Sequence, residues 1–222
     1  MGERETERPM QKTSPRVFVL CAPSGTGKTT VVRALLERAR GQIFFSVSAT
    51  TRPARPLERD GVDYFFLTSE EFQTWIERGD FLEHAEVYGY CYGTPGRPVL
   101  EALEQGRPVL LDIDWQGACQ VRRNLPETVV TLLLLPPSRE ELERRLRGRR
   151  TEEQDQIQRR LREAQQEIRN YRRFDYVIVN QDIERTVTQI RAIMDQSGEM
   201  PCAPLPDLDR RVAELLGDRP PG

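Results

Sequence analysis

The stretch Ala22-Pro-Ser-Gly-Thr-Gly-Lys28-Thr29 decides how this chain folds. It follows the apolar run 17–22, which has the composition of a buried parallel strand, and it leads into helical spacing over residues 29–40. A glycine-rich turn between a strand and a helix directs backbone N–H groups and the positive end of the helix at an anion. The sequence therefore predicts a phosphate-binding loop, although Ala22 stands where the strict motif has glycine.

Two side chains of this loop have defined chemistry. The motif places the Lys28 ammonium on the β- and γ-phosphates of a nucleoside triphosphate and the Thr29 hydroxyl on Mg²⁺. A turn that binds nothing is the alternative, and a Lys-Thr pair at the correct offset argues against it. The residues expected to bind the nucleotide are Ala22, Pro23, Ser24, Gly25, Thr26, Gly27, Lys28 and Thr29.

Further apolar runs alternate with helical patterns along the chain. The runs cover residues 43–47, 109–113, 129–135 and 176–179. Such alternation predicts an α/β fold with a parallel sheet covered by helices on both faces. Between the runs 43–47 and 109–113 we expect a short strand over 64–67, a helix capped by Ser69, and a hairpin beginning at residues 81–87.

Composition excludes several classes of protein. Of the 222 residues 37% are hydrophobic and 31% are charged, and the formal net charge of −2 gives no general attraction to nucleic acid or membranes. The four cysteines form no Cys-x-x-Cys pair, which argues against a zinc site and a disulfide scaffold. The longest apolar run, 129–135, is too short to span a bilayer. We expect a cytoplasmic enzyme.

The loop alone does not identify the reaction. Asp114-Trp-Gln-Gly117 fits the Asp-x-x-Gly pattern of switch GTPases, which makes a GTPase one alternative. GTPases also carry an Asn-Lys-x-Asp motif that reads guanine, and this chain has none, since Asn180-Gln-Asp182 lacks the lysine and the spacing.

Around the loop the sequence resembles guanylate kinases, those of bacteria most of all. The likeness extends over about residues 17–194 and includes Glu83-His-Ala-Glu-Val and Asp112-Ile-Asp-Trp-Gln-Gly. It is densest in five blocks, whose common order makes the match specific: residues 22–29, 45–48 with 50–55, 81–94, 111–117 and 146–149. The resemblance implies a P-loop NTPase core with a five-stranded parallel sheet flanked by helices, an inserted lobe for a nucleoside monophosphate, and a helical lid. It also implies transfer of the γ-phosphoryl group of MgATP to GMP, giving ADP and GDP in purine nucleotide metabolism.

The resemblance also assigns the acceptor site. Guanine presents N1–H and N2–H₂ as adjacent donors, which a carboxylate accepts, whereas adenine has an unprotonated N1 there. The family likeness gives this role to Glu83, with Asp114 near the exocyclic amine and Ser48 donating to O6. It places four further side chains on the GMP phosphate and retains a hydroxyl at a fifth position: Arg52, Arg55, Tyr64, Tyr92 and Thr94. Read without the resemblance, Glu83 is a surface carboxylate, Arg52 and Arg55 belong to an exposed loop, and the tyrosines are sheet-packing aromatics.

Phosphoryl transfer needs cations around the transferred group, because negative charge spreads over its oxygens. The resemblance implies a catalytic set of Lys28, Arg52, Asp112, Arg149 and Arg160, with Arg145 as a further ATP contact. Arg150 stands where the family has glycine, so Arg149 and Arg150 both remain candidates for the lid contact. Asp112 would orient Mg²⁺ through water; a strand-end carboxylate that caps the next helix is the alternative for Asp112 and Asp114. Most other arginines here read as exposed helix pairs, such as Glu141 with Arg145 and Glu143 with Arg147.

The expected organisation is a core interrupted by two inserts. The segments are an unstructured 1–15, a core of 16–47, 95–136 and 161–196, a GMP-binding lobe 48–94, a lid 137–160 and a C-terminal tail 197–222. The tail carries the amphipathic pattern Leu208, Val212, Leu215, Leu216. The expected partners are ATP and GMP, with dGMP as a further acceptor and a homo-oligomer as an open question. The rival readings are a kinase for AMP, UMP or dTMP and an inactive scaffold module, which retention of Lys28 and Glu83 disfavours.

Overall fold

The structure is a computed structural model that describes residues 16–87, 89–147, 154–195 and 207–218. Its centre is a five-stranded sheet in which every strand is parallel to its neighbours. In spatial order the strands are β2 (Phe44–Phe45), β7 (Val109–Asp112), β1 (Val17–Cys21), β8 (Val129–Leu135) and β9 (Tyr176–Val179). The predicted five-stranded parallel sheet is confirmed. The predicted strand 43–47 pairs only at Phe44–Phe45, because the chain then leaves for a second sheet.

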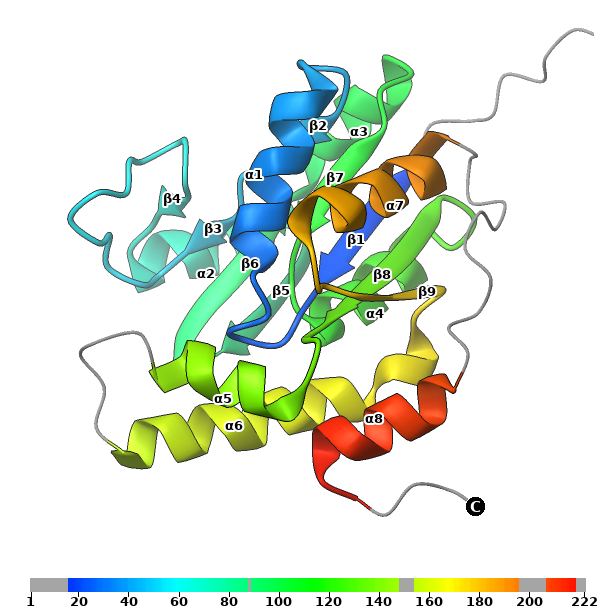
Figure 1. Ribbon diagram of the computed structural model, residues 1–222. Coiled ribbons are helices and arrows are strands. Elements are labelled where there is room, and N and C mark those ends of the chain that lie inside the picture. Colours follow the sequence, from blue (N-terminus) through cyan, green and yellow to red (C-terminus); the bar gives the residue numbers. More distant parts are fainter. Residues whose placement is uncertain (1–15, 88, 148–153, 196–206, 219–222) are drawn as a thin grey trace, which may run out of the picture.

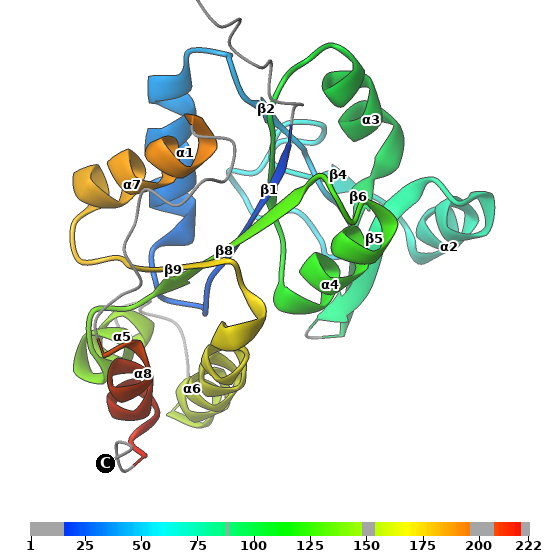
Figure 2. The same cartoon turned by 90° about the vertical axis from the view of Figure 1, so that its right-hand side faces the viewer.

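Helices cover both faces of the central sheet (Figures 1 and 2). Phe18 and Leu20 of β1 point to one face, where α1 (Lys28–Ala39) and α7 (Ile183–Asp195) pack. Val17, Val19 and Cys21 point to the other face, whose core receives side chains from α3 (Gly96–Glu104), α4 (Trp115–Asn124), α5 (Arg139–Arg147) and α6 (Gln154–Arg169). β1 is therefore buried on both sides, as its unbroken apolar run predicts.

The chain segment between β2 and α3 forms a second sheet beside the core (Figure 1). Its strands, in order, are β4 (Phe65–Phe66), β3 (Ala49–Thr50), β6 (Tyr90–Pro95) and β5 (Phe81–Val87). Helix α2 (Ser69–Arg78) packs on it through Phe72 and Trp75, whose rings contact Phe81. The predicted cap Ser69 is wrong: Thr68 is the N-cap, since its hydroxyl accepts from the Glu71 amide and the Glu71 carboxylate accepts from the Thr68 amide.

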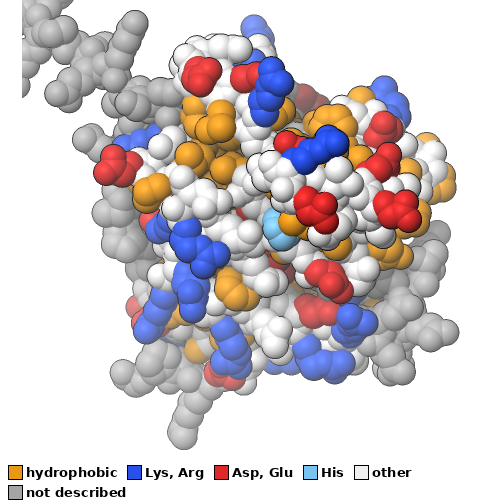
Figure 3. Space-filling view, turned by 180° about the vertical axis from the view of Figure 1, so that it is seen from behind, with side chains coloured by type: hydrophobic (Ala, Val, Ile, Leu, Met, Phe, Trp, Pro, Cys, Tyr) orange, Lys and Arg blue, Asp and Glu red, His pale blue; other side chains and the backbone are white. Residues whose placement is uncertain are grey.

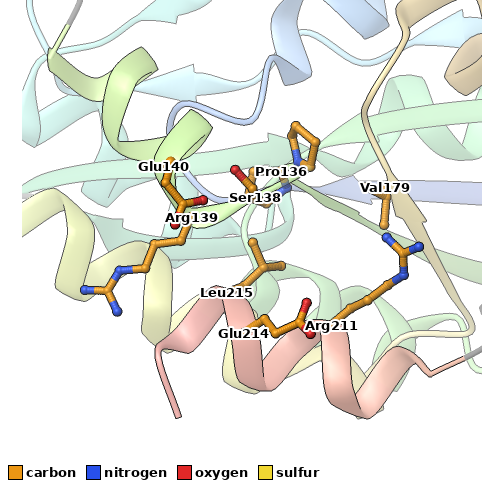
Figure 4. Close-up of a pocket in the computed structure, with 9 residues that line it drawn as sticks. Pro136, Ser138, Arg139, Glu140, Val179, Arg211, Glu214 and Leu215 are labelled. Carbon is orange, nitrogen blue, oxygen red and sulfur yellow. The ribbon is translucent and has the colours of Figure 1, made fainter. Parts of the chain in front are cut away.

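The last described helix, α8 (Leu208–Leu216), lies against α5 and α6 (Figures 1 and 2). Its apolar face joins the core through Val212, Leu215 and Leu216. The short 3₁₀ helix η1 (Tyr171–Arg173) follows α6, and its Tyr171 hydroxyl bonds the Asp209 carboxylate of α8 at 2.5 Å. A hollow of about 290 Å³ remains between α8 and the turn that joins β8 to α5 (Figure 4).

Among the described residues, no helix combines the length and the apolar composition needed to cross a membrane. The predicted segment 1–15, residues 197–206 and 219–222 of the predicted tail, and both Arg149 and Arg150 lie outside the described residues.

Candidate active site

The loop between β1 and α1 has the backbone geometry of an anion cradle. Gly25 and Gly27 adopt φ angles of 89° and 97°, a region that residues with a Cβ rarely enter. Gly27 is also the N-cap of α1, so the loop leads directly into the helix N-terminus. A Cβ on Gly27 would lie 3.0 Å from the Asn180 amide nitrogen. The turn therefore requires glycine at both positions, and the close approach of Asn180 requires it at Gly27 as well.

Asn180 was not assigned a role from the sequence. It follows β9 directly, it is 3% exposed, and its amide donates to the Thr26 carbonyl at 2.8 Å while its own oxygen accepts from Thr186 at 3.0 Å. Arg145 donates to the same Thr26 carbonyl at 2.9 Å. The loop is thus held from two separate elements. In the sequence, the signal for a role of Asn180 is its position at the carboxyl end of a parallel strand, because ligands bind at that edge of a parallel sheet.

Lys28 and Asp112 form an ion pair at the mouth of the loop. Burial lowers the pKa of Lys28, but the neighbouring Asp112 carboxylate outweighs it and leaves the pKa of the ammonium above its ordinary value. Asp112 ends β7, the neighbour of β1. The fold therefore brings together the two charged groups that the sequence placed on the triphosphate and its metal ion.

A cavity of about 390 Å³ opens beside this pair. It joins the loop to the second sheet. The predicted residues that line it are Ala22, Pro23, Ser24, Gly25, Gly27, Lys28, Thr29, Ser48, Arg55, Tyr64, Glu83, Tyr92, Asp112, Asp114 and Arg160. Four further predicted residues do not line it. Arg52 lies over the Tyr64 ring and Thr94 donates to Glu83, whereas Arg145 bonds the carbonyl of Thr26 within the loop. Both predicted phosphate sites thus face one space.

Glu83 is a carboxylate almost withdrawn from water, at 5% exposure. Burial raises its pKa to about 7, Asp114 adds to the rise, and the hydrogen bond from the Thr94 hydroxyl, at 2.7 Å, opposes it. A Cβ at Gly117 would come within 2.5 Å of a Glu83 oxygen. The glycine of the Asp-x-x-Gly pattern therefore makes room for this carboxylate.

Asp114 has two roles in the geometry. It is the N-cap of α4, where its carboxylate accepts from the Gly117 amide at 2.8 Å, so the helix-capping alternative holds for this residue. It also lines the cavity next to Glu83. The cap uses one carboxylate oxygen, and the other has a long contact of 3.5 Å from the exposed Gln116 amide, so it keeps acceptor capacity for a ligand.

Arg52 lies among aromatic rings at the side of the cavity. Its guanidinium is 5.3 Å from the centroid of the Tyr64 ring and 5.8 Å from that of Phe66. Tyr64 and Tyr92 meet edge to face with centroids 6.1 Å apart, and burial raises the pKa of Tyr64. Three of the predicted phosphate contacts therefore form one cluster, while Arg55 is exposed beside it.

Two of the predicted lid arginines reach the loop in different ways. Arg160 donates to the Ser24 hydroxyl at 2.7 Å and lines the cavity. Arg145 bonds Glu141 at 2.6 Å, as the four-residue spacing predicts, and also the loop carbonyl of Thr26. The predicted pairing of Glu143 with Arg147 is wrong, because Glu143 accepts from Arg139, one turn before it.

Glu167 is a cavity residue that sequence reasoning missed. Burial raises its pKa to about 7, the Lys28 ammonium lowers it, and Asp114 and Glu163 raise it. It lies on α6, one position before the buried Ile168. By contrast His84, the single histidine, lies at the surface (pale blue in Figure 3).

The chain has extensive similarity to known proteins. The guanylate kinase family model matches residues 14–197. The guanylate kinase of Chelativorans sp. (strain BNC1) is 45% identical over 92% of this chain and 93% of its own length. That of Syntrophotalea carbinolica is 49% identical over 82% of this chain and 86% of its own length. The crystal structure of guanylate kinase from Anaplasma phagocytophilum superposes with a TM-score of 0.71 and 38% identity, covering 86% of this chain and 89% of that one.

The matches extend through the phosphate-binding loop, the second sheet and the lid arginines alike. From this agreement of sequence, fold and cavity we conclude that the chain belongs to the guanylate kinase family, the enzymes that phosphorylate GMP with ATP.

Proposed function

We propose that ATP and GMP meet in the 390 Å³ cavity, with ATP on the loop 22–29 and GMP against the second sheet. The observation that carries this proposal is the buried carboxylate of Glu83, which faces the same cavity as the Lys28 ammonium. The same cavity therefore contains an ammonium group that can bind phosphates and a carboxylate that can accept hydrogen bonds from a base. We assign residues 48–94 to the GMP-binding lobe and 137–160 to the lid, and both would close over the substrates to exclude water.

Guanine recognition rests on Glu83. Its ionised carboxylate would accept N1–H and N2–H₂ together, with Asp114 also near the amine and Ser48 donating to O6. Thr94 supports this arrangement, since its hydroxyl holds one Glu83 oxygen at 2.7 Å. Adenine would place the lone pair of its unprotonated N1 against the buried Glu83 carboxylate. A buried charge without a hydrogen-bond donor is strongly disfavoured.

The phosphate of GMP would lie by Arg52, Arg55, Tyr64 and Tyr92. Guanidinium groups bind phosphate in bidentate fashion, and the two tyrosine hydroxyls add donors. The proposal gains support from the Arg52–Tyr64–Tyr92 cluster at the side of the cavity. Since these assignments involve the base and the phosphate, we extend the proposal to dGMP.

In the transfer itself an oxygen of the GMP phosphate attacks the γ-phosphorus of ATP. The new O–P bond forms as the bond to the β-phosphate oxygen breaks, and ADP leaves. Lys28 would stabilise the charge on the β- and γ-phosphates, and Arg160 would approach the transferred group from α6. Its hydrogen bond to Ser24 supports this position. Arg145 and Arg149 are the further lid residues that we assign to ATP.

Mg²⁺ is the metal ion we expect with ATP. Thr29 and Asp112 line the same cavity and offer a hydroxyl and a carboxylate, the hard oxygen donors that this ion accepts. Thr29 would bind it directly and Asp112 through water, while the ion neutralises phosphate charge. We further propose that the enzyme acts in the cytoplasm; its oligomeric state stays an open question.

Replacing Glu83→Gln tests the guanine assignment. An amide presents an N–H₂ group where guanine also has donors, so kcat/KM for GMP should fall at least about 100-fold. KM for ATP should stay within about twofold, because the loop is untouched. The measurement is ADP release in a coupled assay with GMP, AMP, UMP and dTMP as acceptors. An equal loss for ATP and GMP would refute the assignment.

A further inference from the structure

Glu58 holds both of the arginines assigned to the GMP phosphate. One of its oxygens accepts from the Arg52 guanidinium at 2.9 Å, and the other accepts from the Arg55 backbone amide at 2.8 Å. The Arg55 guanidinium also lies 4.0 Å from the first oxygen. A single carboxylate thus fixes the side chain of one arginine and the backbone of the other.

These contacts are partly sheltered from water, although the loop that carries them lies at the surface. The Glu58 side chain is 17% exposed and that of Arg52 is 12% exposed, which separates them from the open ion pairs of the surface helices. The hydrogen bond from Arg52 is the main reason why the pKa of Glu58 lies below its ordinary value. The carboxylate is therefore ionised at neutral pH.

The Arg52 guanidinium keeps donors for a ligand. It has five N–H groups; the contacts with Glu58 and with the Pro53 carbonyl, at 2.7 Å, use two of them, and a bond to the Tyr92 hydroxyl uses a third. The rings of Tyr64 and Phe66 limit its other directions. Glu58 therefore orients the guanidinium without occupying it.

We infer that Glu58 is a positioning residue that preorganises Arg52 and Arg55 for the 5′-phosphate of the acceptor, which deepens the proposed function and rests on it. A carboxylate near a phosphate dianion also repels it, which would favour tighter binding once Glu58 is neutral. Neutralising Glu58 would also weaken its hold on the Arg52 guanidinium and on the Arg55 backbone. We expect these two losses to lower the affinity for the phosphate by more than the relief of repulsion raises it. A flexible arginine must then be ordered by the ligand, at the expense of affinity.

The variant Glu58→Gln tests the inference. Its amide oxygen can still accept from Arg52, but its N–H₂ group cannot accept from the Arg55 amide. We expect KM for GMP to rise about tenfold, with kcat and KM for ATP within about twofold of the parent enzyme. Glu58→Asp keeps the charge and should lie between the two. The matched control is Asp63→Asn, which removes a charge from the same loop at a carboxylate that accepts from the Arg59 amide; its KM for GMP should not change.

Guanosine separates positioning of the phosphate site from general damage to the lobe. It carries the base without the phosphate, so its inhibition constant against GMP should be equal in Glu58→Gln and the parent. The double variant Arg52→Gln/Glu58→Gln should raise KM for GMP by less than the product of the two single increases, because Glu58 acts in part through Arg52 and in part through the Arg55 backbone. An unchanged or lower KM for GMP in Glu58→Gln overturns the inference, as does guanosine inhibition weakened to the same degree.

Failure of the proposed function would look different. If the parent enzyme releases ADP with ATP and GMP but Arg52→Gln keeps the parental KM for GMP, the phosphate assignment is wrong and the inference falls with it. If Arg52→Gln raises KM for GMP and Glu58→Gln does not, the assignment stands and only the role of Glu58 is overturned.

Discussion

Glu83 combines burial with the charge that the proposed contact with guanine requires. Its pKa of about 7 follows from burial and from the nearby Asp114, and the Thr94 hydroxyl limits the rise. The free protein therefore carries a mixture of protonated and ionised Glu83 at neutral pH. A protonated Glu83 would direct its O–H at the N–H donors of guanine, so guanine should bind the ionised form.

The affinity for guanosine should therefore depend on pH. With a pKa of about 7 the ionised fraction of Glu83 grows about tenfold between pH 6 and pH 8, and the affinity should rise by the same factor. Guanosine is the suitable probe because the phosphate of GMP itself titrates near pH 6. The measurement is calorimetric titration at several pH values.

Glu167 provides the control for this experiment, since its pKa is also raised to about 7 in the same cavity. The Glu167→Gln variant should keep the pH dependence of guanosine binding. If it abolishes that dependence, Glu167 and not Glu83 is the group that titrates.

At the scale of elements, α8 completes a core that the other helices leave open. Val212, Leu215 and Leu216 belong to the same buried cluster as Leu142 and Leu146 of α5. The family match ends at residue 197, so this helix lies beyond it. Because α5 and α6 carry Arg145 and Arg160, α8 supports the elements that present these arginines to the phosphate-binding loop.

Truncation of Leu215 should reveal this support. Leu215→Ala removes a side chain that is 5% exposed and should lower the free energy of unfolding by about 2–5 kcal/mol. Chemical denaturation measures the loss. Arg210→Ala on the solvent side of the same helix is the control, with a change within about 0.5 kcal/mol. Equal stability of the two variants would mean that the packing of α8 contributes little.

At the scale of the whole molecule, the loop is held at one carbonyl by distant parts of the chain. Thr26 accepts from Arg145 on α5 and from Asn180 after β9, and Asn180 is in turn bonded to Thr186 on α7. Helix α5 and the far edge of the central sheet therefore share an anchor in the loop to which we assign ATP.

Asn180→Ala should loosen this anchor. It removes the donor to Thr26 and leaves the Thr186 hydroxyl without its acceptor, which should lower stability by about 1–3 kcal/mol. KM for ATP should rise more than KM for GMP, because we assign ATP to this loop. Steady-state kinetics and thermal melting give both values. Thr188→Ala serves as the control, since the Thr188 hydroxyl bonds only within its own helix, to the Glu184 carbonyl. A parental KM for ATP in Asn180→Ala would contradict the anchor.

The sequence predicted the parts of this protein that local pattern encodes. The buried strands and the turn into α1 carry their apolar runs and glycines in one continuous stretch, and they were confirmed. Glu167 could not be predicted, because its surroundings come from elements that meet only in the folded chain. For Asn180 the sequence offered its position after a buried strand, but its partners Thr26 and Thr186 are brought to it only by folding. The cap of α2 shows a finer limit, since Thr68 and Ser69 both suit the role and hydrogen-bond geometry selects Thr68.

The central position of β1 also bears on how the protein folds. Its partners β7 and β8 both come much later in the chain than β1 itself, and the nearer β2 pairs with β7 instead. Pairings of such high contact order form slowly, since a long loop must close before they gain stability. We therefore expect β1 to join the sheet late in folding, so that the nucleotide would accelerate refolding little and mainly slow unfolding.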